Sequence, residues 1–300
     1  MKPKEIAMSY LLIGNISALI CEDCIEPLAN ARIRIYLPDG QYDAEQLARG
    51  IFKDLRQVSE RDVLAKSERL LAESTLDDRG NFSVDWEDIH LFTEPLEMDI
   101  CLNDLKGRQN GQQGWVQYHL STFVPHWKRN KDKHVAAFAY VVPSDKWNVI
   151  RGAFSTWVIT GAVKDANSHQ GIGAVRVEAY NAWNNRLLGW ADTSDNGRYK
   201  IYFSEKEVSG GRLLHLIREE GIRHLGPDVY FKVYAGSRLI WCESKETALR
   251  PERQQLAPCS KLNILIRPDA VKKQPRLTGW LHDLIHTTKT QANYKDHYVM

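Results

Sequence analysis

The sequence predicts a mainly β protein of two antiparallel β-sandwich domains, with helical insertions and a short C-terminal helix. Apolar and polar residues alternate along short segments, as in AVRVEAY at 174–180 and DVYFKVY at 228–234. A period of two gives a strand one buried face and one exposed face. Turns rich in Asp, Asn and Gly separate these segments, a pattern typical of an antiparallel sandwich.

The same pattern occurs in both halves of the chain. LAESTLDDRGNFSVDW at 71–86 and LGWADTSDNGRYKIYF at 188–203 each read as a strand, an Asp-rich turn closed by Gly, and an aromatic residue that opens the next strand. We expect Gly80 and Gly197 to lie in tight hairpin turns between adjacent antiparallel strands, because Gly tolerates the left-handed backbone. The alignment of the two halves pairs Gly14 with Gly161, 32–36 with 176–180, Gly80 with Gly197, Phe82 with Tyr199, 95–102 with 227–234, and 135–142 with 262–268.

We expect the first domain to span 9–145, the second to span 153–268, and a linker with an amphipathic tail to span 269–300. Each domain should carry a helical insertion, the first near 43–72 and the second near 205–220. In the first insertion, Asp43 is a suitable N-cap for an apolar stripe of Leu47, Ile51, Leu55 and Val58. In the second, Ser204 and Glu207 form a capping-box pattern before Leu213, Leu214 and Ile217.

The motif residues of both halves resemble the carboxypeptidase-regulatory-like, transthyretin-like β-sandwich. The resemblance implies a fold and not a reaction, because proteins with this fold are functionally diverse. The second half carries the pattern at Gly161, Val163, Asp165, Ala174, Val175, Val177, Tyr180, Thr193, Asp195, Gly197 and Tyr199. The first half is a degenerate copy that keeps Gly14, Ile16, Tyr36, Thr75, Asp78, Gly80 and Phe82.

Composition narrows the class of partner and the compartment. The formal net charge is +2, too small to draw the chain to nucleic acid, and there is no run of about 18 apolar residues to span a membrane. The segment 1–20 resembles a signal peptide, but polar residues interrupt it and 155–165 matches it internally, so we expect a strand over 9–20. Five cysteines, an odd number, favour reduced thiols. We therefore expect a cytoplasmic protein, exported only as part of an assembly.

No motif in the sequence specifies a reaction. We find no nucleophile elbow, P-loop or dinucleotide fingerprint, and we expect no catalytic residues, no cofactor and no metal. Cys21 and Cys24 form a CxxC pair that lacks the second pair of a zinc site, although a redox or zinc role stays open. His282 and His286 share a helical face without a carboxylate between them, so surface histidines are the simpler interpretation.

Three further features have a structural and a functional interpretation. The turn with Asp192, Asp195 and Asn196 is explained by turn chemistry, with calcium binding as the alternative. The basic stretch 126–134 is explained as a solvated loop, with a phosphate or an acidic partner as the alternative. We expect core positions for four tryptophans, whereas exposure would favour carbohydrate stacking; these are Trp115, Trp157, Trp190 and Trp241.

We therefore expect a non-catalytic protein that binds or scaffolds another protein. The resemblance implies modules of bacterial toxin and contractile-injection assemblies, where such repeats serve as adaptors, spike extensions or cargo. A carbohydrate-binding module and an enzyme of an unrecognised class are the alternatives. The partner-binding element that we expect is the tail helix over 277–286, whose apolar face consists of Leu277, Trp280, Leu281, Leu284 and Ile285.

Deletion of 269–300 should leave the melting temperature nearly unchanged and abolish capture of the partner. The reason is that the tail follows the last sandwich strand, so neither core needs it. Thermal melts and affinity capture from the native lysate measure the two effects. A large drop in melting temperature would instead mean that the tail packs on its own domain.

Overall fold

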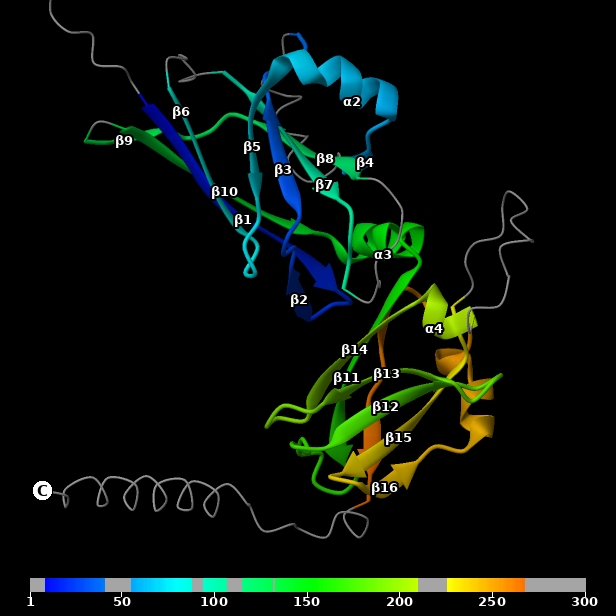
Figure 1. Cartoon of the computed structure of the whole chain (residues 1–300). Helices are drawn as coiled ribbons and strands as arrows, with labels where there is room; N and C mark the ends of the chain where they lie inside the picture. Colours follow the sequence, from blue (N-terminus) through cyan, green and yellow to red (C-terminus); the bar gives the residue numbers. More distant parts are fainter. Residues whose placement is uncertain are drawn as a thin grey trace, which may run out of the picture.

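The computed structural model describes residues 9–40, 55–87, 94–106, 115–131, 133–209 and 226–267. The protein is mainly β, as the alternation of apolar residues predicts, and its sheets form two β-sandwich halves. The halves lie end to end, with helix α3 (Ser144–Ala153) where they meet (Figure 1).

The first half consists of two sheets of five strands each. In one sheet, β1 (Ser9–Ile20) lies between β10 on one side and the strands β2 and β6 on the other. Strand β9 pairs antiparallel with β10. The bounds of the other strands of this sheet are β2 Cys24–Pro27, β6 Asn81–Glu87, β9 Lys128–Asn130 and β10 Lys133–Val142. The other sheet has the order β4 (Arg56–Gln57), β8 (Val116–Phe123), β7 (Leu96–Leu102), β3 (Arg32–Tyr36) and β5 (Leu70–Thr75).

The second half repeats this arrangement with shorter sheets of four strands each. Strand β11 (Thr156–Asp165) is antiparallel to β14 (Arg198–Ser204) and parallel to β17 (Cys259–Lys261) and β18 (Ile264–Ile266). The facing sheet has the order β13 (Leu187–Asp192), β12 (Arg176–Asn181), β15 (Val229–Ala235) and β16 (Arg238–Cys242). The remaining elements are α2 Glu60–Lys66, η1 Ser67–Arg69, α4 Glu205–Ser209, η3 Lys245–Leu249 and η4 Pro251–Arg253.

The pairing registers of the two halves match residue by residue. Gly14 lies opposite Phe82, and Gly161 lies opposite Tyr199. Both glycines are required by close approach, because an added Cβ would lie 2.1 Å from the carbonyl oxygen of Phe138 at Gly14 and 1.7 Å from that of Leu262 at Gly161. A β-bulge occurs at an equivalent place in both halves. The pairing of β3 with β5 shifts between Ile35 and Tyr36, and the pairing of β12 with β13 shifts between Ala179 and Tyr180.

The register also corrects the sequence alignment of β7 with β15 by one residue. Arg32 lies opposite Cys101, and Arg176 lies opposite Tyr234, so Cys101 and not Leu102 is the equivalent of Tyr234. The alignment matched the two prolines that precede these strands. A shift of one residue exchanges the faces of a strand, so the side-chain comparison below depends on the observed register.

Gly80 and Gly197 lie in turns with positive φ values of 77° and 78°. The expectation that these turns close hairpins within one sheet is wrong. Each turn passes from one sheet of its sandwich to the other, from β5 to β6 and from β13 to β14, because β5 and β13 pair with β3 and β12 while β6 and β14 pair with β1 and β11. In the first turn the Asp77 carboxylate accepts the backbone N–H groups of Arg79 and Asn81.

The described part of the first insertion contains helix α2 at Glu60–Lys66, which follows the predicted apolar stripe in the sequence. The Ser59 hydroxyl accepts the N–H of Asp62 as its N-cap. Leu55 and Val58 are not helical, because 56–57 pairs with β8 and the Val58 N–H donates to the Gln117 carbonyl. Tertiary pairing thus overrides the helical spacing. Asp43, Leu47 and Ile51 lie outside the described residues.

In the second insertion, the Glu207 carboxylate accepts both the N–H and the hydroxyl of Ser204 at the start of α4, as the capping-box pattern predicts. Leu213, Leu214 and Ile217 lie outside the described residues.

Each half has its own hydrophobic core. One cluster of buried side chains runs from Tyr10 to Val158, and the other runs from Trp157 to Ile266. The chain therefore passes from the first core to the second at the start of β11, where Val158 belongs to the first core and Trp157 to the second. The domain boundaries at 145 and 153 stay a prediction.

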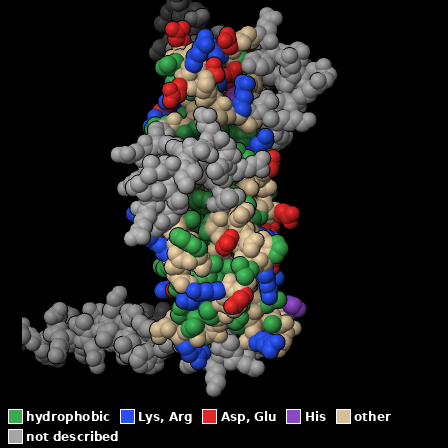
Figure 2. All heavy atoms as spheres, turned by 90° about the vertical axis from the view of Figure 1, so that its right-hand side faces the viewer, with side chains coloured by type: hydrophobic (Ala, Val, Ile, Leu, Met, Phe, Trp, Pro, Cys, Tyr) green, Lys and Arg blue, Asp and Glu red, His purple; other side chains and the backbone are tan. Residues whose placement is uncertain are grey.

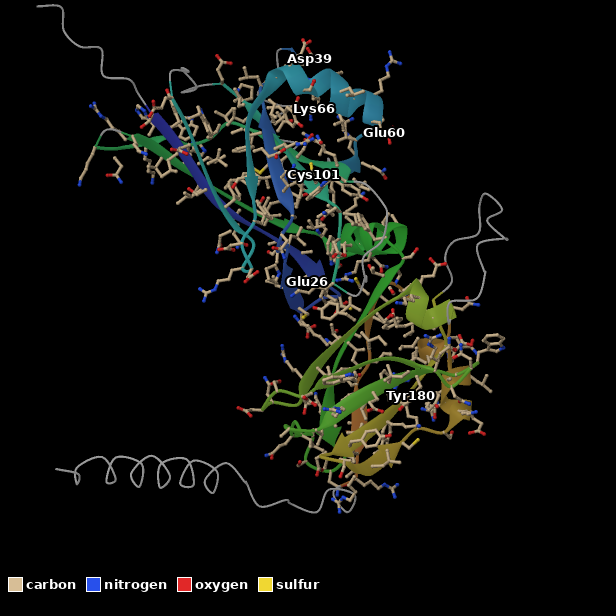
Figure 3. The ribbon with its side chains drawn as sticks, in the orientation of Figure 1. Glu26, Asp39, Glu60, Lys66, Cys101 and Tyr180 are labelled. Carbon is tan, nitrogen blue, oxygen red and sulfur yellow. The ribbon has the colours of Figure 1, made fainter. Side chains whose placement is uncertain are left out.

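A buried ion pair joins the two halves. Arg151 of α3 is completely buried, and its guanidinium donates to both carboxylate oxygens of Glu26 at 3.1 and 2.9 Å. Trp147 donates its indole N–H to the same carboxylate, and the guanidinium lies 5.4 Å from the ring centre of Tyr202 in β14. Glu26 lies at the junction in Figure 3. The guanidinium of Arg151 in the connecting helix thus contacts both strand β2 and the second half.

Substitution Glu26→Gln should destabilise the protein by about 3 kcal/mol or more, because it leaves the Arg151 charge buried without a counter-charge. Urea unfolding followed by tryptophan fluorescence measures the change. The matched control is Asp23→Asn, which breaks the exposed contact of Asp23 with Lys261 across the same junction. Exposed pairs contribute little, so the control should unfold like the wild type. Equal midpoints for Glu26→Gln and the wild type would contradict the role of the buried pair.

Candidate functional site

The outer side of the sheet β13-β12-β15-β16 gathers aromatic and charged side chains in the second half. Alternation directs Val177 and Val233 into the core and their neighbours outward. Trp190 is 50% exposed, and Trp183, in the turn after β12, is 88% exposed. We call this surface the open face; it consists of the buried Tyr230 together with Arg176, Glu178, Tyr180, Trp190, Asp192, Lys232 and Tyr234, which are half-buried or exposed.

Cations and rings are ordered against one another on the open face. The guanidinium carbon of Arg176 lies 4.2 Å from the ring centre of Trp190, and the Lys232 ammonium lies 4.2 Å from that of Tyr180. Tyr180 stacks on Tyr230 at 5.4 Å between centres. Contacts of this kind hold the side chains in place before any ligand arrives.

The Tyr180 hydroxyl is fixed as a hydrogen-bond donor. It donates to the Glu178 carboxylate at 2.6 Å. Burial raises the pKa of Tyr180, and the contact with Glu178 raises the pKa further. The phenol therefore stays protonated, and it uses one oxygen of the Glu178 carboxylate as its acceptor.

The equivalent face of the first half is closed. Its ring–cation contacts are repeated: Arg32 lies 4.5 Å from the ring centre of Trp115, and the Lys66 ammonium lies 4.8 Å from that of Tyr36. Lys66, however, comes from α2, which lies at the upper end of this sheet (Figures 1 and 3), and its side chain reaches the centre of the face. We call this surface the covered face; it consists of Arg32, Arg34, Tyr36, Glu73, Glu97, Asp99, Cys101, Gln117 and His119.

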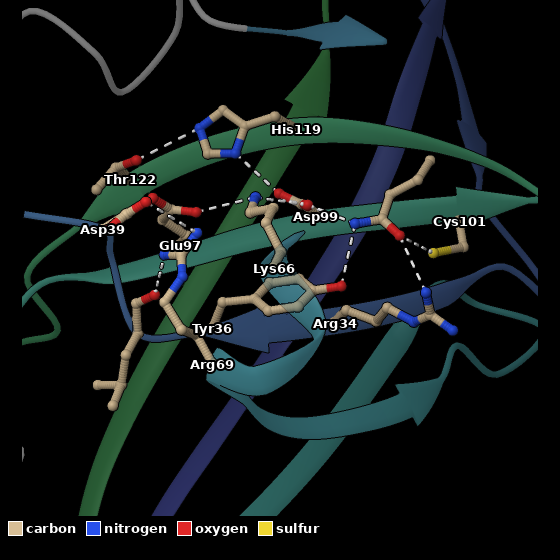
Figure 4. A network of polar contacts seen from close by, with 12 residues as sticks. Arg34, Tyr36, Asp39, Lys66, Arg69, Glu97, Asp99, Cys101, His119 and Thr122 are labelled. Carbon is tan, nitrogen blue, oxygen red and sulfur yellow. Dashed lines mark hydrogen bonds and ion pairs between the residues drawn. The ribbon is translucent and has the colours of Figure 1, made fainter. Parts of the chain in front are cut away.

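A buried polar network fills the covered face (Figure 4). The Lys66 ammonium lies 2.8 Å from the Asp99 carboxylate and 2.9 Å from that of Glu97. His119 Nδ1 lies 2.8 Å from Asp99 Oδ1, and Gln117 donates to Asp99 Oδ2 at 2.6 Å. Asp99 is completely buried. All the charges are satisfied within the network, as in a structural ion-pair cluster.

The thiol beside this network is not a nucleophile. Burial raises the pKa of Cys101 to about 11, so the thiolate is scarce at neutral pH. Elsewhere, burial raises the pKa of the Cys259 thiol to about 12. All five cysteines are free thiols. Within the described ranges, no three His, Cys, Asp or Glu side chains come together in a way that could hold a metal ion.

The predicted partner-binding residues lie outside the part of the chain that the structure describes. The tail face of Leu277, Trp280, Leu281, Leu284 and Ile285 lies outside the described residues, as do His282 and His286, so the tail stays a prediction. Cys21 and Cys24 flank the turn between β1 and β2. The basic stretch near 126–134 contains strand β9 and the buried Trp127.

Two of the four tryptophans are not in the core. Trp157 is buried and Trp241 is half-buried, but Trp115 is 45% exposed and Trp190 is 50% exposed, so the core prediction is wrong for these two. For Trp190, the bulge beside Tyr180 explains why the simple alternation does not predict its exposure. It changes the alternation along β13, so Leu188 and Trp190, two residues apart, point to opposite sides. The one sequence feature that indicates the open face is the arginine found at equivalent positions of the two halves, Arg32 and Arg176.

Hydrophobic side chains gather over the lower part of the molecule when it is seen from the right of Figure 1, and charged ones gather at the top (Figure 2).

A groove of about 1000 Å³ lies at the junction of the halves. Two contacts bridge it: Lys261 pairs with Asp23 at 2.8 Å, and Lys200 donates to the Ile25 carbonyl at 3.3 Å. Its charged lining residues are Asp23, Lys164, Asp192, Arg198, Lys200 and Lys261.

No family model matches the chain, and no curated protein matches it. Among solved structures, the TIE protein of Bacillus anthracis aligns with a TM-score of 0.26 and 8% identity over 87% of this chain, which spans 34% of that protein. The shaft pilin SpaA of Lactobacillus rhamnosus GG gives 0.27 and 10% over 90% of this chain and 100% of its own.

A putative carbohydrate-binding protein of Pseudomonas aeruginosa gives a TM-score of 0.25 and 12% identity over 47% of this chain and 92% of its own. Scores this low do not establish a common fold, so the properties of these proteins do not transfer to this chain. Among the described helices, none has the length and apolar character needed to cross a membrane.

The variant Asp99→Asn should be less stable than the wild type at neutral pH and should lose less stability on acidification. Burial alone would raise the pKa of Asp99, but His119, Lys66 and Gln117 outweigh it and hold the pKa below its usual 3.8. The stabilisation by this carboxylate is therefore complete above about pH 4 and disappears as the pH falls through the lowered folded-state pKa.

Urea midpoints measured between about pH 6 and pH 3 for both proteins test this. Asp77, whose pKa is lowered by hydrogen bonds from Asn81, titrates in both proteins, so the difference between the curves reports Asp99. Parallel curves would contradict the prediction.

Proposed function

We propose that this chain is a non-catalytic adaptor that holds another protein against the open face. The observation that carries the proposal is the difference between two equivalent surfaces: Lys66 of α2 lies on the centre of one, and the other has the half-exposed Trp190 on it. Aromatic side chains and arginine are enriched in protein interfaces and dominate their binding energy. A rigid junction at Glu26 and Arg151 suits a scaffold, because it fixes the orientation of the open face.

A protein ligand is favoured over a sugar by the position of the cations. Sugars stack on the free faces of aromatic rings. On the open face, Arg176 covers one face of Trp190, and Lys232 covers one face of Tyr180. Carbohydrate binding remains the second candidate because of Trp183, whose side chain is 88% exposed.

The finer assignments are also proposals. The motif residues and the repeated pairing of Gly14 and Gly161 support a transthyretin-like, carboxypeptidase-regulatory-like class for both halves. The resemblance supports a place in a bacterial toxin or injection assembly, with synthesis in the cytoplasm. The tail over 277–286 would then be a second contact with such an assembly, by virtue of its apolar residues.

Substitution Trp190→Ala should lower the capture of the partner from the native lysate by on the order of tenfold, the effect of removing one interface hot spot. The matched control is Trp115→Ala, which removes an equally exposed indole that also carries an arginine, but beside the covered face. Quantitative mass spectrometry of the captured proteins measures the effect. Equal capture by the wild type and by Trp190→Ala would refute the proposed function.

Titration of the purified protein with a panel of soluble glycans separates the second candidate. A protein-binding open face predicts no change in tryptophan fluorescence at millimolar glycan. A saturable change that Trp183→Ala abolishes would favour the carbohydrate-binding module instead.

A further inference from the structure

We propose that the open face binds an acidic segment of the partner protein, one that presents a carboxylate side chain to Lys232. The inference rests on the proposed function, because it assumes a partner protein on the open face. It specifies the charge that this partner must bring.

The covered face shows how a segment occupies such a sheet. Within α2, Lys66 is the buried residue, and its neighbour Leu64 is 72% exposed. The cover is therefore held on the sheet by one charged side chain and not by an apolar stripe. That side chain reaches Tyr36 and the two carboxylates of Glu97 and Asp99.

The register assigns the equivalent positions on the open face. Arg34 lies opposite Asp99 in the first half, and Glu178 lies opposite Lys232 in the second. Asp99 therefore corresponds to Lys232. By the same register Glu97 corresponds to Tyr230.

The charge at the centre of the face is thus reversed. A carboxylate receives a lysine of the cover in the first half, whereas the second half offers an ammonium at the same place. An occupant of the open face would need a carboxylate where α2 carries Lys66. A second lysine there would lie against Lys232 in a partly desolvated interface, where like charges repel strongly.

Lys232 is free to accept this carboxylate. Within the part of the chain that the structure describes, it has no ion pair and rests on the ring of Tyr180. Glu178 lies directly opposite, and no ion pair between these two described residues is formed; one oxygen of the Glu178 carboxylate accepts the Tyr180 hydroxyl. The other cation of the face, Arg176, already contacts Asp192 at 3.5 Å.

The surroundings would strengthen such a pair. Trp190 and Leu239 are about half exposed on either side of it, at 50% and 48%. An apolar rim that a partner covers excludes water from the charges at the centre, and the interaction becomes stronger in the lower dielectric.

The first test is capture of the partner by Lys232→Glu. Capture should fall on the order of tenfold, as expected for the reversal of one charge at the centre of an interface. The matched control is Lys146→Glu in α3, the same change at an exposed site outside the open face and outside the basic stretch 126–134, which should capture like the wild type. If Lys232→Glu captures as well as this control while Trp190→Ala does not, the inference is wrong and the proposed function stands.

The second test needs no captured partner. Two helix-stapled peptides copy the cover segment 59–69, one with its lysine and one with Lys66→Glu. The Lys66→Glu peptide should bind the full-length protein on the order of tenfold more tightly than the lysine peptide, weaken with added salt, and shift the amide NMR signals of β12 and β15.

The preference between the peptides should be reversed in the Lys232→Glu protein. Equal affinities for the two peptides, no binding of the Lys66→Glu peptide at millimolar concentration, or NMR shifts confined to the first half would each overturn the inference.

Discussion

The register shift beside Tyr180 is the local constraint on which the open face depends. It lies between Ala179 and Tyr180 and leaves Leu188 of β13 as an extra residue; the first half has an equivalent shift between Ile35 and Tyr36. Without the shift, Leu188 and Trp190 would lie on the same side of β13, because they are two residues apart. With the shift, Leu188 is buried while Trp190 is on the outside of the sheet, where it contacts Arg176 near the pair of Tyr180 and Lys232.

The buried pair of Glu26 and Arg151 has a different role, because it connects two otherwise separate cores. A buried ion pair is weak evidence for stability, since its desolvation offsets its attraction. Its value here is geometric: the guanidinium contacts strand β2, lies in the connecting helix, and faces Tyr202 of the second half. A hydrophobic contact of equal size would leave the angle between the halves less well defined.

The sequence predicted much of the fold and little of the site. Alternation placed Val177 and Val233 in the core, and the repeat placed Gly14 and Gly161 at matching positions, because both signals are local to a strand. The hairpins were wrong, since a turn sequence such as that around Gly80 specifies its backbone and not which sheets it connects. The contact of Lys66 with Asp99 joins residues 33 positions apart, and only the completed sandwich brings them together. The exposure of Trp190 followed from a bulge that leaves no signature in composition.

Under the proposed function, the cover over the first half also limits the number of partners that these faces can bind. Two similar exposed faces on a rigid body would make the molecule bivalent, and a bivalent linker joins its ligands into extended networks. Because Lys66 pairs with the Asp99 carboxylate, the centre of one of the two faces is already occupied by a side chain of the same chain. Under the proposed function, the chain would bind one ligand through these faces and would not cross-link two.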